Sequence, residues 1–400
     1  MRTNARICSA THGFNLSKWS VECVETNIAA QGAIMRSIHV RVGLAIATLS
    51  LSVMGMSSVA QAGIPVEQYA DHPIHVEPNA TTAPTGLDPA AIKGAYGFST
   101  RATAGAGQVI AIVDAYDDPN AEADLNVFST AFGLPLCTTN NGCFTKVDQD
   151  GDTKYPKSNS GWALEISLDV QWAHAIAPGA HILLVEAKSA AFKNLMAAED
   201  YAKTHANYVS NSWGTAEFVG ESAYDAHFVQ PGVSFFVSSG DTGIPAQYPS
   251  SSPNVISVGG TTLNFVDGAF STETGWSGSG GGCSLYENAT IEQQNFSTYG
   301  QVNCAGRRAT PDVSLDADPK SGVSVYDSVP YLGQTGWWRV GGTSASAPMW
   351  AGRSAISGQT VNSGYVYGNR IHFRDITSGN NGSPALTGYD LVTGRGSWTD

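Results

Sequence analysis

The chain has 400 residues, of which only 14% are charged, whereas glycine accounts for 44 of them. Few charges and many small residues indicate a compact, loop-rich fold and exclude a coiled coil or a charge-rich disordered chain. The 34 acidic residues outnumber the 21 basic ones and give a formal net charge of −13 at pH 7. A field of that sign repels phosphate backbones, so we expect no nucleic-acid partner.

The N-terminal part has the pattern of a removable leader. Residues 43–59 form one apolar run, preceded by two arginines and followed by the sequence AQA at 60–62. This pattern is typical of a secretory signal peptide, here over 35–62, and predicts an extracellular or periplasmic protein with no membrane association after cleavage. A transmembrane anchor is the alternative, although the run is slightly short for a span. Residues 1–34 carry no structural pattern and are predicted to be non-structural upstream sequence.

Beyond the leader, strand and helix patterns alternate. Residues 63–90 are proline-rich, lack periodicity and are predicted to be an extended lead-in to one domain over 91–400. Apolar runs predict strands at 109–113, 181–185, 207–211, 233–237 and 255–258. Helical spacing predicts helices at 121–132, 164–177, 193–205 and 349–356. The alternation predicts an α/β fold with a mostly parallel central sheet flanked by helices. Residues 259–300 are predicted to form long loops or hairpins.

Four cysteines lie beyond the predicted leader. An even number in an exported chain predicts two disulfides, and three connectivities are possible. The local pairing, Cys137–Cys143 with Cys283–Cys304, is favoured; free thiols are the alternative. No Cys/His spacing indicates zinc.

A glycine-rich turn, GGTSASAP at 341–348, precedes the apolar helical stretch 349–356. A hydroxyl exposed at a helix N-terminus lies where backbone N–H groups and the dipole favour developing negative charge, so Ser344 is a candidate nucleophile. An ordinary helix cap is the alternative. The segment resembles the nucleophile segment of subtilisin-like peptidases, but no histidine lies in the H-G-T-H motif that such an enzyme needs. A different base must therefore activate the hydroxyl.

Three carboxyl groups are candidates for that missing chemistry. Glu165 and Asp169 lie four residues apart on one face of an otherwise apolar helix, where repulsion and burial raise both pKa values and the pair can share a proton. Asp241, after the strand at 233–237, can donate a hydrogen bond to a tetrahedral oxyanion when protonated. The alternatives are a solvated acidic helix face and an aspartate turn or cap.

Together these pieces resemble the sedolisin family of serine-carboxyl peptidases. The motifs that carry the resemblance are AYGF at 95–98, IAIVDAYDDP at 110–119, ALEISLDVQWAHAIAP at 163–178, SNSWG at 210–214, SSGDTG at 238–243, GGTSASAP at 341–348 and DITSGNNG at 375–382. The resemblance implies a subtilisin-like fold with a seven-stranded parallel sheet. It implies Glu165 as general base and acid, Asp169 as its partner, Asp241 as the oxyanion residue and Ser344 as the nucleophile.

The resemblance extends to residues around this group. Asp114 stands where some members carry a further acid linked to the Glu–Asp pair, although a strand-end aspartate capping the next turn is the alternative. Ser212, Trp213 and Gly214 match the stretch that lines the substrate cleft and pairs with extended peptide. Trp213 is alternatively a core aromatic.

A C-terminal calcium-binding loop is also implied. Its ligands would be carboxylate or carbonyl oxygens of Asp375, Ile376, Leu386, Gly388 and Asp390, holding one structural Ca²⁺. Leu386 stands where the family usually has glycine. A plain aspartate-containing loop is the alternative.

The resemblance predicts a secreted, monomeric endopeptidase that cleaves proteins or peptides through a Ser344 acyl-enzyme at acidic pH. Two departures favour an alternative, a catalytically silent sedolisin-like binding or surface protein. The family is usually made with a large prodomain, whereas here only 63–90 separates leader and domain. The stretch 354–373 is also shorter than usual, which would weaken support for Ser344. An ordinary subtilisin would need a histidine base that the sequence does not offer.

Overall fold

The computed structural model describes residues 67–72, 74–76, 79–368 and 373–399, and the backbone of two strands near the N-terminus. The chain forms two compact units, Met1–Gly63 and Ile64–Asp400. In the first, β1 (Arg6–His12) and β2 (Trp19–Glu25) pair as an antiparallel hairpin in a segment for which the sequence predicted no element. The signal peptide predicted over 35–62 lies outside the described residues. No described helix is long and apolar enough to cross a bilayer.

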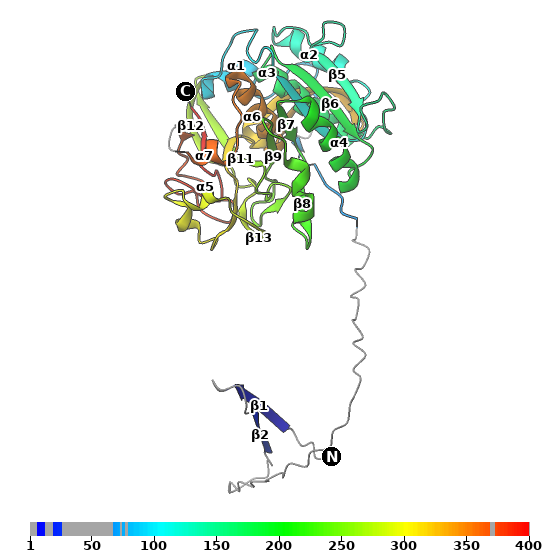
Figure 1. Ribbon diagram of the computed structural model, residues 1–400. Helices are drawn as coiled ribbons and strands as arrows, with labels where there is room; N and C mark the ends of the chain where they lie inside the picture. The colour runs from blue at the N-terminus through cyan, green and yellow to red at the C-terminus, as the bar shows by residue number, and fades with distance from the viewer. Residues whose placement is uncertain are drawn as a thin grey trace. The chain divides into compact units, whose positions relative to one another are not determined.

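The second unit is built on a sheet whose central seven strands are all parallel, in the order β15-β11-β9-β7-β4-β6-β5 (Figure 1). Their bounds are β4 (Val109–Ala115), β5 (Phe144–Asp148), β6 (His181–Ala187), β7 (Tyr208–Asn211), β9 (Ser234–Ser238), β11 (Ile256–Val266) and β15 (Val313–Asp316). The predicted α/β architecture is confirmed. All five predicted strands are present, whereas β5 and β15 were not predicted.

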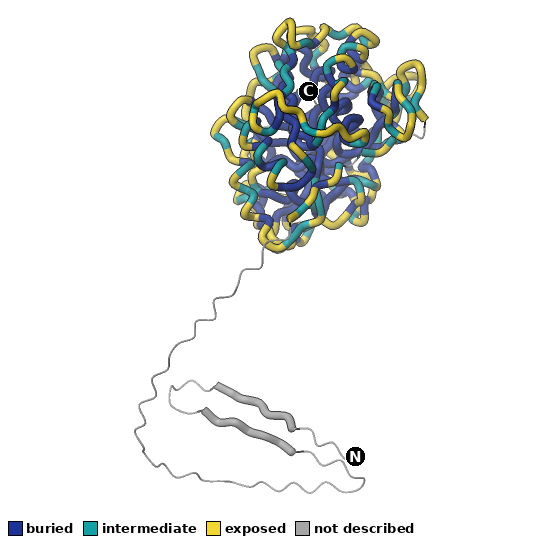
Figure 2. The backbone as a smooth tube through the Cα atoms, turned by 90° about the vertical axis from the view of Figure 1, so that its right-hand side faces the viewer, coloured by how far each residue is buried: buried dark blue, intermediate teal, exposed yellow. Residues whose placement is uncertain are grey.

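Helices cover both faces of this sheet (Figure 1). The helices α2 (Ala121–Ala131), α3 (Ser160–Ile176) and α6 (Thr343–Ser357) pack on one face, and α4 (Phe192–His205) packs on the other. Alternate side chains of β4 divide accordingly: Ile110 and Ile112 join the core beneath α3, whereas Ala111 and Val113 join the core beneath α4. Figure 2 shows these central elements as buried and the connecting loops as exposed.

Helix α3 is buried along all but its first two residues, which decides the environment of its carboxyl groups. It begins at Ser160, four residues before the predicted start, because the Asn159 side chain accepts hydrogen bonds from the N–H groups of Gly161 and Trp162. Every residue from Trp162 to Ile176 is buried. On the side away from the sheet it packs under β16 (Val323–Tyr331) of the β16–β17 hairpin. Any charge on this helix is therefore desolvated.

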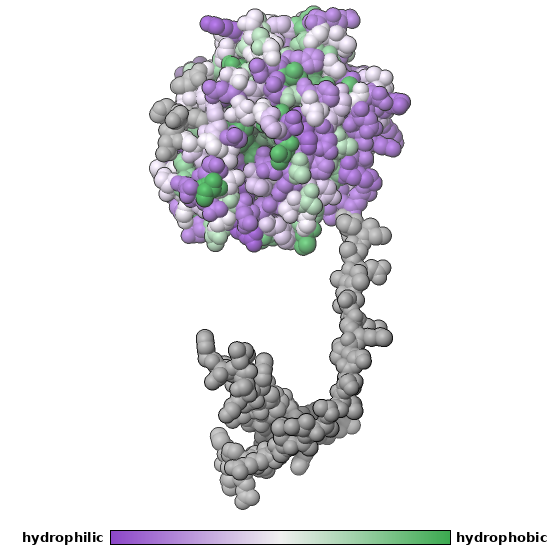
Figure 3. Space-filling model, viewed as in Figure 1, coloured by the Kyte–Doolittle hydropathy of each residue, from purple (hydrophilic) through white to green (hydrophobic). Residues whose placement is uncertain are grey.

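The glycine-rich region 259–300 forms hairpins rather than loops alone, as one of the two alternatives predicted. The other strands are β12 (Ala269–Gly275), β13 (Gly282–Asn288), β14 (Arg307–Thr310), β17 (Gln334–Gly341), β18 (Phe373–Arg374), β19 (Ser397–Trp398), β3 (His75–Val76), β8 (Thr215–Ala216) and β10 (Gln247–Tyr248). The remaining helices are α1 (Pro89–Tyr96), α5 (Ile291–Gln294), α7 (Ser363–Tyr367), η1 (Glu221–Phe228), η2 (Tyr299–Val302) and η3 (Pro319–Ser321). On the face shown in Figure 3, apolar residues are scattered among polar ones.

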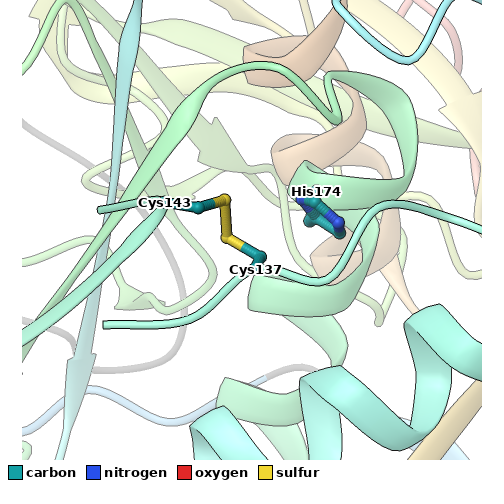
Figure 4. Close-up of side chains that lie close together, drawn as sticks. All are labelled: Cys137, Cys143 and His174. Carbon is teal, nitrogen blue, oxygen red and sulfur yellow. A yellow bond between two sulfur atoms is a disulfide. The ribbon is translucent and has the colours of Figure 1, made fainter. Parts of the chain in front are cut away.

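The two disulfides have the predicted local pairing, Cys137–Cys143 and Cys283–Cys304. His174 of α3 lies beside the first of them (Figure 4), and its Nε2 is 2.8 Å from the carbonyl oxygen of Pro135. Burial lowers the pKa of His174 to about 4, so its ring is neutral. Because both sulfurs are in the disulfide, this group offers no thiolate to a metal ion.

Buried carboxyl groups outside the sheet edge make stability depend on pH, and Glu199 on α4 is the clearest case. It is fully buried, and neither carboxyl oxygen has a hydrogen-bond partner among the described residues. Burial raises its pKa from 4.5 to about 8, although Asn211 and Lys203 offset part of the rise. Because the folded-state pKa is the higher one, this group stabilises the fold fully below pH 4.5 and loses that effect as pH rises through 8.

Glu199→Gln is expected to flatten the pH dependence of stability. Between pH 4.5 and 8 the variant's free energy of unfolding should fall by up to about 1.4 kcal/mol less per pH unit than that of the wild type. Denaturant unfolding at four pH values in this window measures the slopes. The exposed Glu292→Gln is the matched control, and equal slopes for wild type and Glu199→Gln would contradict the assignment.

Candidate active site

Three neighbouring parallel strands end at the same edge of the sheet and carry polar side chains there. Asp114 is the penultimate residue of β4, Ser212 follows β7, and Asp241 lies three residues beyond β9. Helices α3 and α6 add Glu165, Asp169 and Ser344, and the pKa of each carboxyl group responds to its neighbours in the set. The structure therefore brings together all four predicted catalytic residues with Asp114 and Ser212. Sheet edges of this kind are where open α/β folds place ligand sites.

Glu165, Asp169 and Asp114 form a fully buried carboxyl cluster. None of their six oxygens has a partner at hydrogen-bonding geometry among the described residues. Burial raises all three pKa values; for Asp169 the Glu165 charge adds to the rise, and for Asp114 the charges of Asp169 and Glu165 do so. Such a cluster holds shared protons instead of three negative charges. Asp114 caps no turn, which removes the alternative left open for it.

Ser344 is the second residue of α6, which begins at Thr343 and not at Met349 as predicted. Pro348 lies inside this helix and has no N–H to donate to the carbonyl of Ser344. The Ser212 hydroxyl donates to that carbonyl instead, at 3.3 Å. The Ser344 hydroxyl interacts with Glu165, and together with His72 it offsets part of the rise that burial causes in the pKa of Glu165.

Helix α6 also bears on the expectation that 354–373 is too short to support Ser344. It runs for 15 residues, and its residues from Thr343 to Ala355 are buried. It ends at Gly358, whose φ of 63° is the left-handed conformation that favours glycine at a helix end. The helix that carries the hydroxyl is therefore buried over most of its length.

Asp241 uses its two carboxyl oxygens differently. Oδ1 accepts hydrogen bonds from the N–H of Thr343 at 2.8 Å and from its hydroxyl at 2.9 Å, which ties the strand end to the start of α6. Oδ2 lies 3.2 Å from Nε2 of His75 and has no hydrogen-bond partner among the other described residues. Burial raises the pKa of Asp241, while His75 and Thr343 offset part of the rise. One oxygen thus anchors the residue and leaves the other for chemistry.

Two histidines of the lead-in contact these carboxyl groups, and no pattern in the sequence indicated that they would. Nδ1 of His72 is 3.6 Å from Oε2 of Glu165, and its ring packs edge-on against Trp162 at 4.9 Å between centroids. His75 faces Asp241 and packs edge-on against Trp276 at 5.8 Å. The lead-in predicted as extended therefore crosses the candidate site.

The stretch 212–214 divides between core and cleft. The Trp213 side chain is fully buried, and its Nε1 donates to the carbonyl of Val113 at 2.8 Å, so its indole belongs to the core. Gly214 exchanges two main-chain hydrogen bonds with Asp71, at 2.9 and 3.0 Å, as an antiparallel partner strand would. A Cβ on Gly214 would come within 3.2 Å of the Tyr248 carbonyl oxygen, which explains the glycine.

In the C-terminal loop, the carboxyl groups of Asp375 and Asp390, two of the predicted calcium ligands, accept hydrogen bonds from main-chain N–H groups in the segment 386–388. Both oxygens of Asp375 accept from the Gly388 N–H, at 3.2 and 3.0 Å. Oδ2 of Asp390 accepts from the Leu386 N–H at 3.0 Å. Asp390 is buried, and burial raises its pKa to about 6. Ile376 is buried next to Asp375 in sequence. Carboxylate oxygens are ligands that a hard cation prefers. Oδ1 of Asp390 also accepts from the N–H groups of Val392 and Thr393, so both carboxyl groups already accept hydrogen bonds within the loop.

Comparisons with known proteins agree on one family. A model of the subtilase family matches residues 144–370. Kumamolisin from Bacillus sp. (strain MN-32) is 29% identical over 90% of this chain and 70% of its own length. Sedolisin from Pseudomonas sp. (strain 101) is 28% identical over 86% of this chain and 65% of its own length, so the chain spans about two thirds of these relatives. The solved structure of Pseudomonas sedolisin, a serine-carboxyl proteinase complexed with two molecules of pseudo-iodotyrostatin, matches with a TM-score of 0.66 and 28% identity, over 80% of this chain and 96% of that one.

Proposed function

Because the chain belongs to the subtilase family and is a member of its sedolisin group, we propose that it is an endopeptidase that hydrolyses proteins in acid through a Ser344 acyl-enzyme. The observation that supports this proposal is a helix-terminal hydroxyl, Ser344, that interacts with buried Glu165 on a helix whose first residue, Thr343, is bonded to buried Asp241. Neither histidine near the site takes the place of a subtilisin base, because both belong to the lead-in and contact the carboxyl groups.

We propose the following proton path. The Ser344 hydroxyl attacks the peptide carbonyl carbon while its proton passes to Glu165, and Asp169 with Asp114 keeps a proton inside the cluster. The tetrahedral oxyanion accepts a hydrogen bond from protonated Asp241. The intermediate collapses, Glu165 returns the proton to the leaving amine, and an acyl-enzyme remains. In the second half, a water attacks the acyl carbon while its proton passes to Glu165. Glu165 then returns that proton to the leaving Ser344 oxygen, which frees the acid product and restores the Ser344 hydroxyl.

Acidic pH should favour the protonated carboxyl groups that this scheme requires. Asp241 must be protonated to donate, and the Glu165–Asp169 pair must hold one proton while Glu165 accepts another. Burial raises the pKa of all three groups, which extends their protonated forms to higher pH than ordinary carboxyl groups allow. As pH rises through these values, Asp241 loses its proton and repels the oxyanion. We therefore propose that activity peaks in acid and falls toward neutrality.

A peptide aldehyde separates this proposal from the silent alternative. An activated serine adds to an aldehyde and forms a hemiacetal, whereas an inert serine does not. Incubation at acidic pH followed by mass mapping should place the adduct on Ser344. Absence of adduct at Ser344, with no cleavage of a denatured protein, would favour the binding or surface protein. Pseudo-iodotyrostatin, the compound in the sedolisin structure, is a second probe of the same site.

We propose further that the C-terminal loop binds one structural Ca²⁺ through Asp375, Asp390 and main-chain carbonyls of Ile376, Leu386 and Gly388. Calcium removal by a chelator is expected to lower the thermal midpoint by several degrees, since binding to the folded state alone contributes about 3–4 kcal/mol when the ion is at 100–1,000 times its Kd. Scanning calorimetry with and without added Ca²⁺ measures the shift. Asp375→Asn should show a smaller shift, and a midpoint indifferent to calcium in the wild type would contradict the site.

The remaining expectations complete the proposal. The domain over 91–400, preceded by the lead-in, acts on protein or peptide substrates as a monomer, outside the cell or in the periplasm, after removal of a leader over 35–62. Two disulfides fit that environment.

A further inference from the structure

The lead-in occupies the candidate cleft as a bound peptide would. Upstream, it lies between two segments of the domain: the Phe192 N–H donates to the Gln68 carbonyl at 2.9 Å, and Asp71 pairs with Gly214 in both directions. Downstream, His75 and Val76 pair antiparallel with Gly341 and Val340, at the end of β17 that leads into α6. Main-chain pairing on both sides of a site is how clefts hold extended peptides.

Within this segment, the imidazoles of His72 and His75 have similar surroundings. Each lies against one tryptophan and one carboxyl group: His72 against Trp162 and Glu165, His75 against Trp276 and Asp241. The side chain of His72 is 16% exposed and that of His75 is 47% exposed, so the upstream position is the more enclosed one. A protonated imidazole is favoured in each by the neighbouring carboxyl group and by the aromatic ring. The two positions are three residues apart, and each lies on one of the two carboxyl groups proposed to act with Ser344.

We propose that the cleft recognises peptides that carry two imidazole side chains three residues apart, and that Gln68–Val76 is its built-in example. The inference rests on the proposed function for the site but concerns which ligands the site takes. Trp162 and Trp276 are the residues that determine this preference. They touch the ligand's side chains, and they stand outside the group that moves protons.

The lead-in occupies the cleft, but its backbone conformation differs from that of an ideal extended substrate. The Ile74 N–H donates to the His72 carbonyl at 3.1 Å, a local hydrogen bond that a fully extended substrate does not make. The His72 carbonyl is therefore bonded within the lead-in itself. The whole chain therefore carries its own competitor, and an outside peptide must displace it.

Binding can be measured without activity. The test protein is the full chain with His72→Ala and His75→Ala, which loosens the internal competitor. It is titrated calorimetrically at about pH 5, where free imidazole is protonated. The ligands are a nine-residue peptide with the sequence of Gln68–Val76, the same peptide with either histidine replaced by alanine, and an isomer in which the last two residues are exchanged so that the histidines stand four apart.

The native peptide should bind about tenfold more tightly than each single-alanine peptide, and the isomer should lose most of that advantage. In a protein that also carries Trp276→Phe, the penalty for losing the downstream imidazole should shrink while that for the upstream one stays. Equal affinities for all four peptides, or no binding, would overturn the inference. Preferential binding without cleavage of any protein would leave the inference standing and remove the proposed function.

Discussion

Replacing Ser344 by alanine is expected to abolish proteolysis, with kcat/KM falling by about 10⁴-fold or more, because no other group can form the acyl-enzyme. The substitution removes one oxygen from a fully buried position in the first turn of α6. The measurement is hydrolysis of a denatured protein at acidic pH by freshly purified wild type and variant. Glu165→Gln should cost nearly as much, since losses within one catalytic unit do not add.

A matched serine on the same helix separates chemistry from folding. Ser346 is also fully buried, but its hydroxyl donates to the main-chain carbonyls of Leu315 and Asp316, at 3.0 Å each. Ser346→Ala should cost about 1 kcal/mol of stability through those hydrogen bonds and leave kcat/KM within a fewfold of wild type. If Ser344→Ala retained the rate of wild type, another nucleophile would have to be sought.

The candidate catalytic residues could be predicted because each stands in a local pattern with a chemical meaning. The i, i+4 spacing puts Glu165 and Asp169 on one turn of a helix, and a strand end before a glycine places Asp241 at the sheet edge. Parallel topology then brings the strand ends together. None of this needs information about which distant segments touch.

The parts that could not be predicted depend on contacts between distant segments. His72 lies 93 positions before Glu165 in a segment with no periodicity, so its place in the cleft is fixed by pairing with Gly214 and β17. The early start of α6 was missed because Thr343–Pro348 contains serine, threonine and proline, which are poorer helix formers than alanine. Ser212 and Asp241, which follow β7 and β9, form hydrogen bonds with its first turn.

The two unpredicted strands show the same limit. β5 is short and contains Lys146, which weakens the apolar pattern expected of a buried strand. In the structure Lys146 forms an ion pair with Glu186 of the neighbouring strand, at 3.0 Å. β15 has four residues, and two of them, Ser314 and Asp316, are polar and buried. Their partners lie elsewhere in the chain: the Ser321 hydroxyl donates to Asp316 at 2.5 Å. Local hydropathy therefore underestimates strands whose polar groups are satisfied by tertiary contacts.

The sharpest test of the carboxyl chemistry is the pH profile of Asp241→Asn. An amide preserves an acceptor for the Thr343 N–H and places a permanent N–H donor where Oδ2 stands, so it can hold the oxyanion whatever the pH. In the wild type, kcat/KM should fall as pH rises through the raised pKa values of Asp241 and the Glu165–Asp169 pair. In Asp241→Asn one of these ionisations is gone, and the falling limb should move to higher pH.

Two further variants show which group causes that shift in the pH profile. Asp241→Ala removes the donor altogether and should lower kcat by about 10²–10³-fold at the acidic pH where wild-type Asp241 is protonated, with a smaller difference as pH rises. His75 faces Oδ2 of Asp241 and titrates itself, with the Asp241 carboxyl raising its pKa. His75→Ala therefore shows how much of the profile belongs to the imidazole. If Asp241→Asn and wild type gave superimposable profiles, Asp241 would not be the group whose protonation limits activity, and the falling limb would belong to the Glu165 cluster alone.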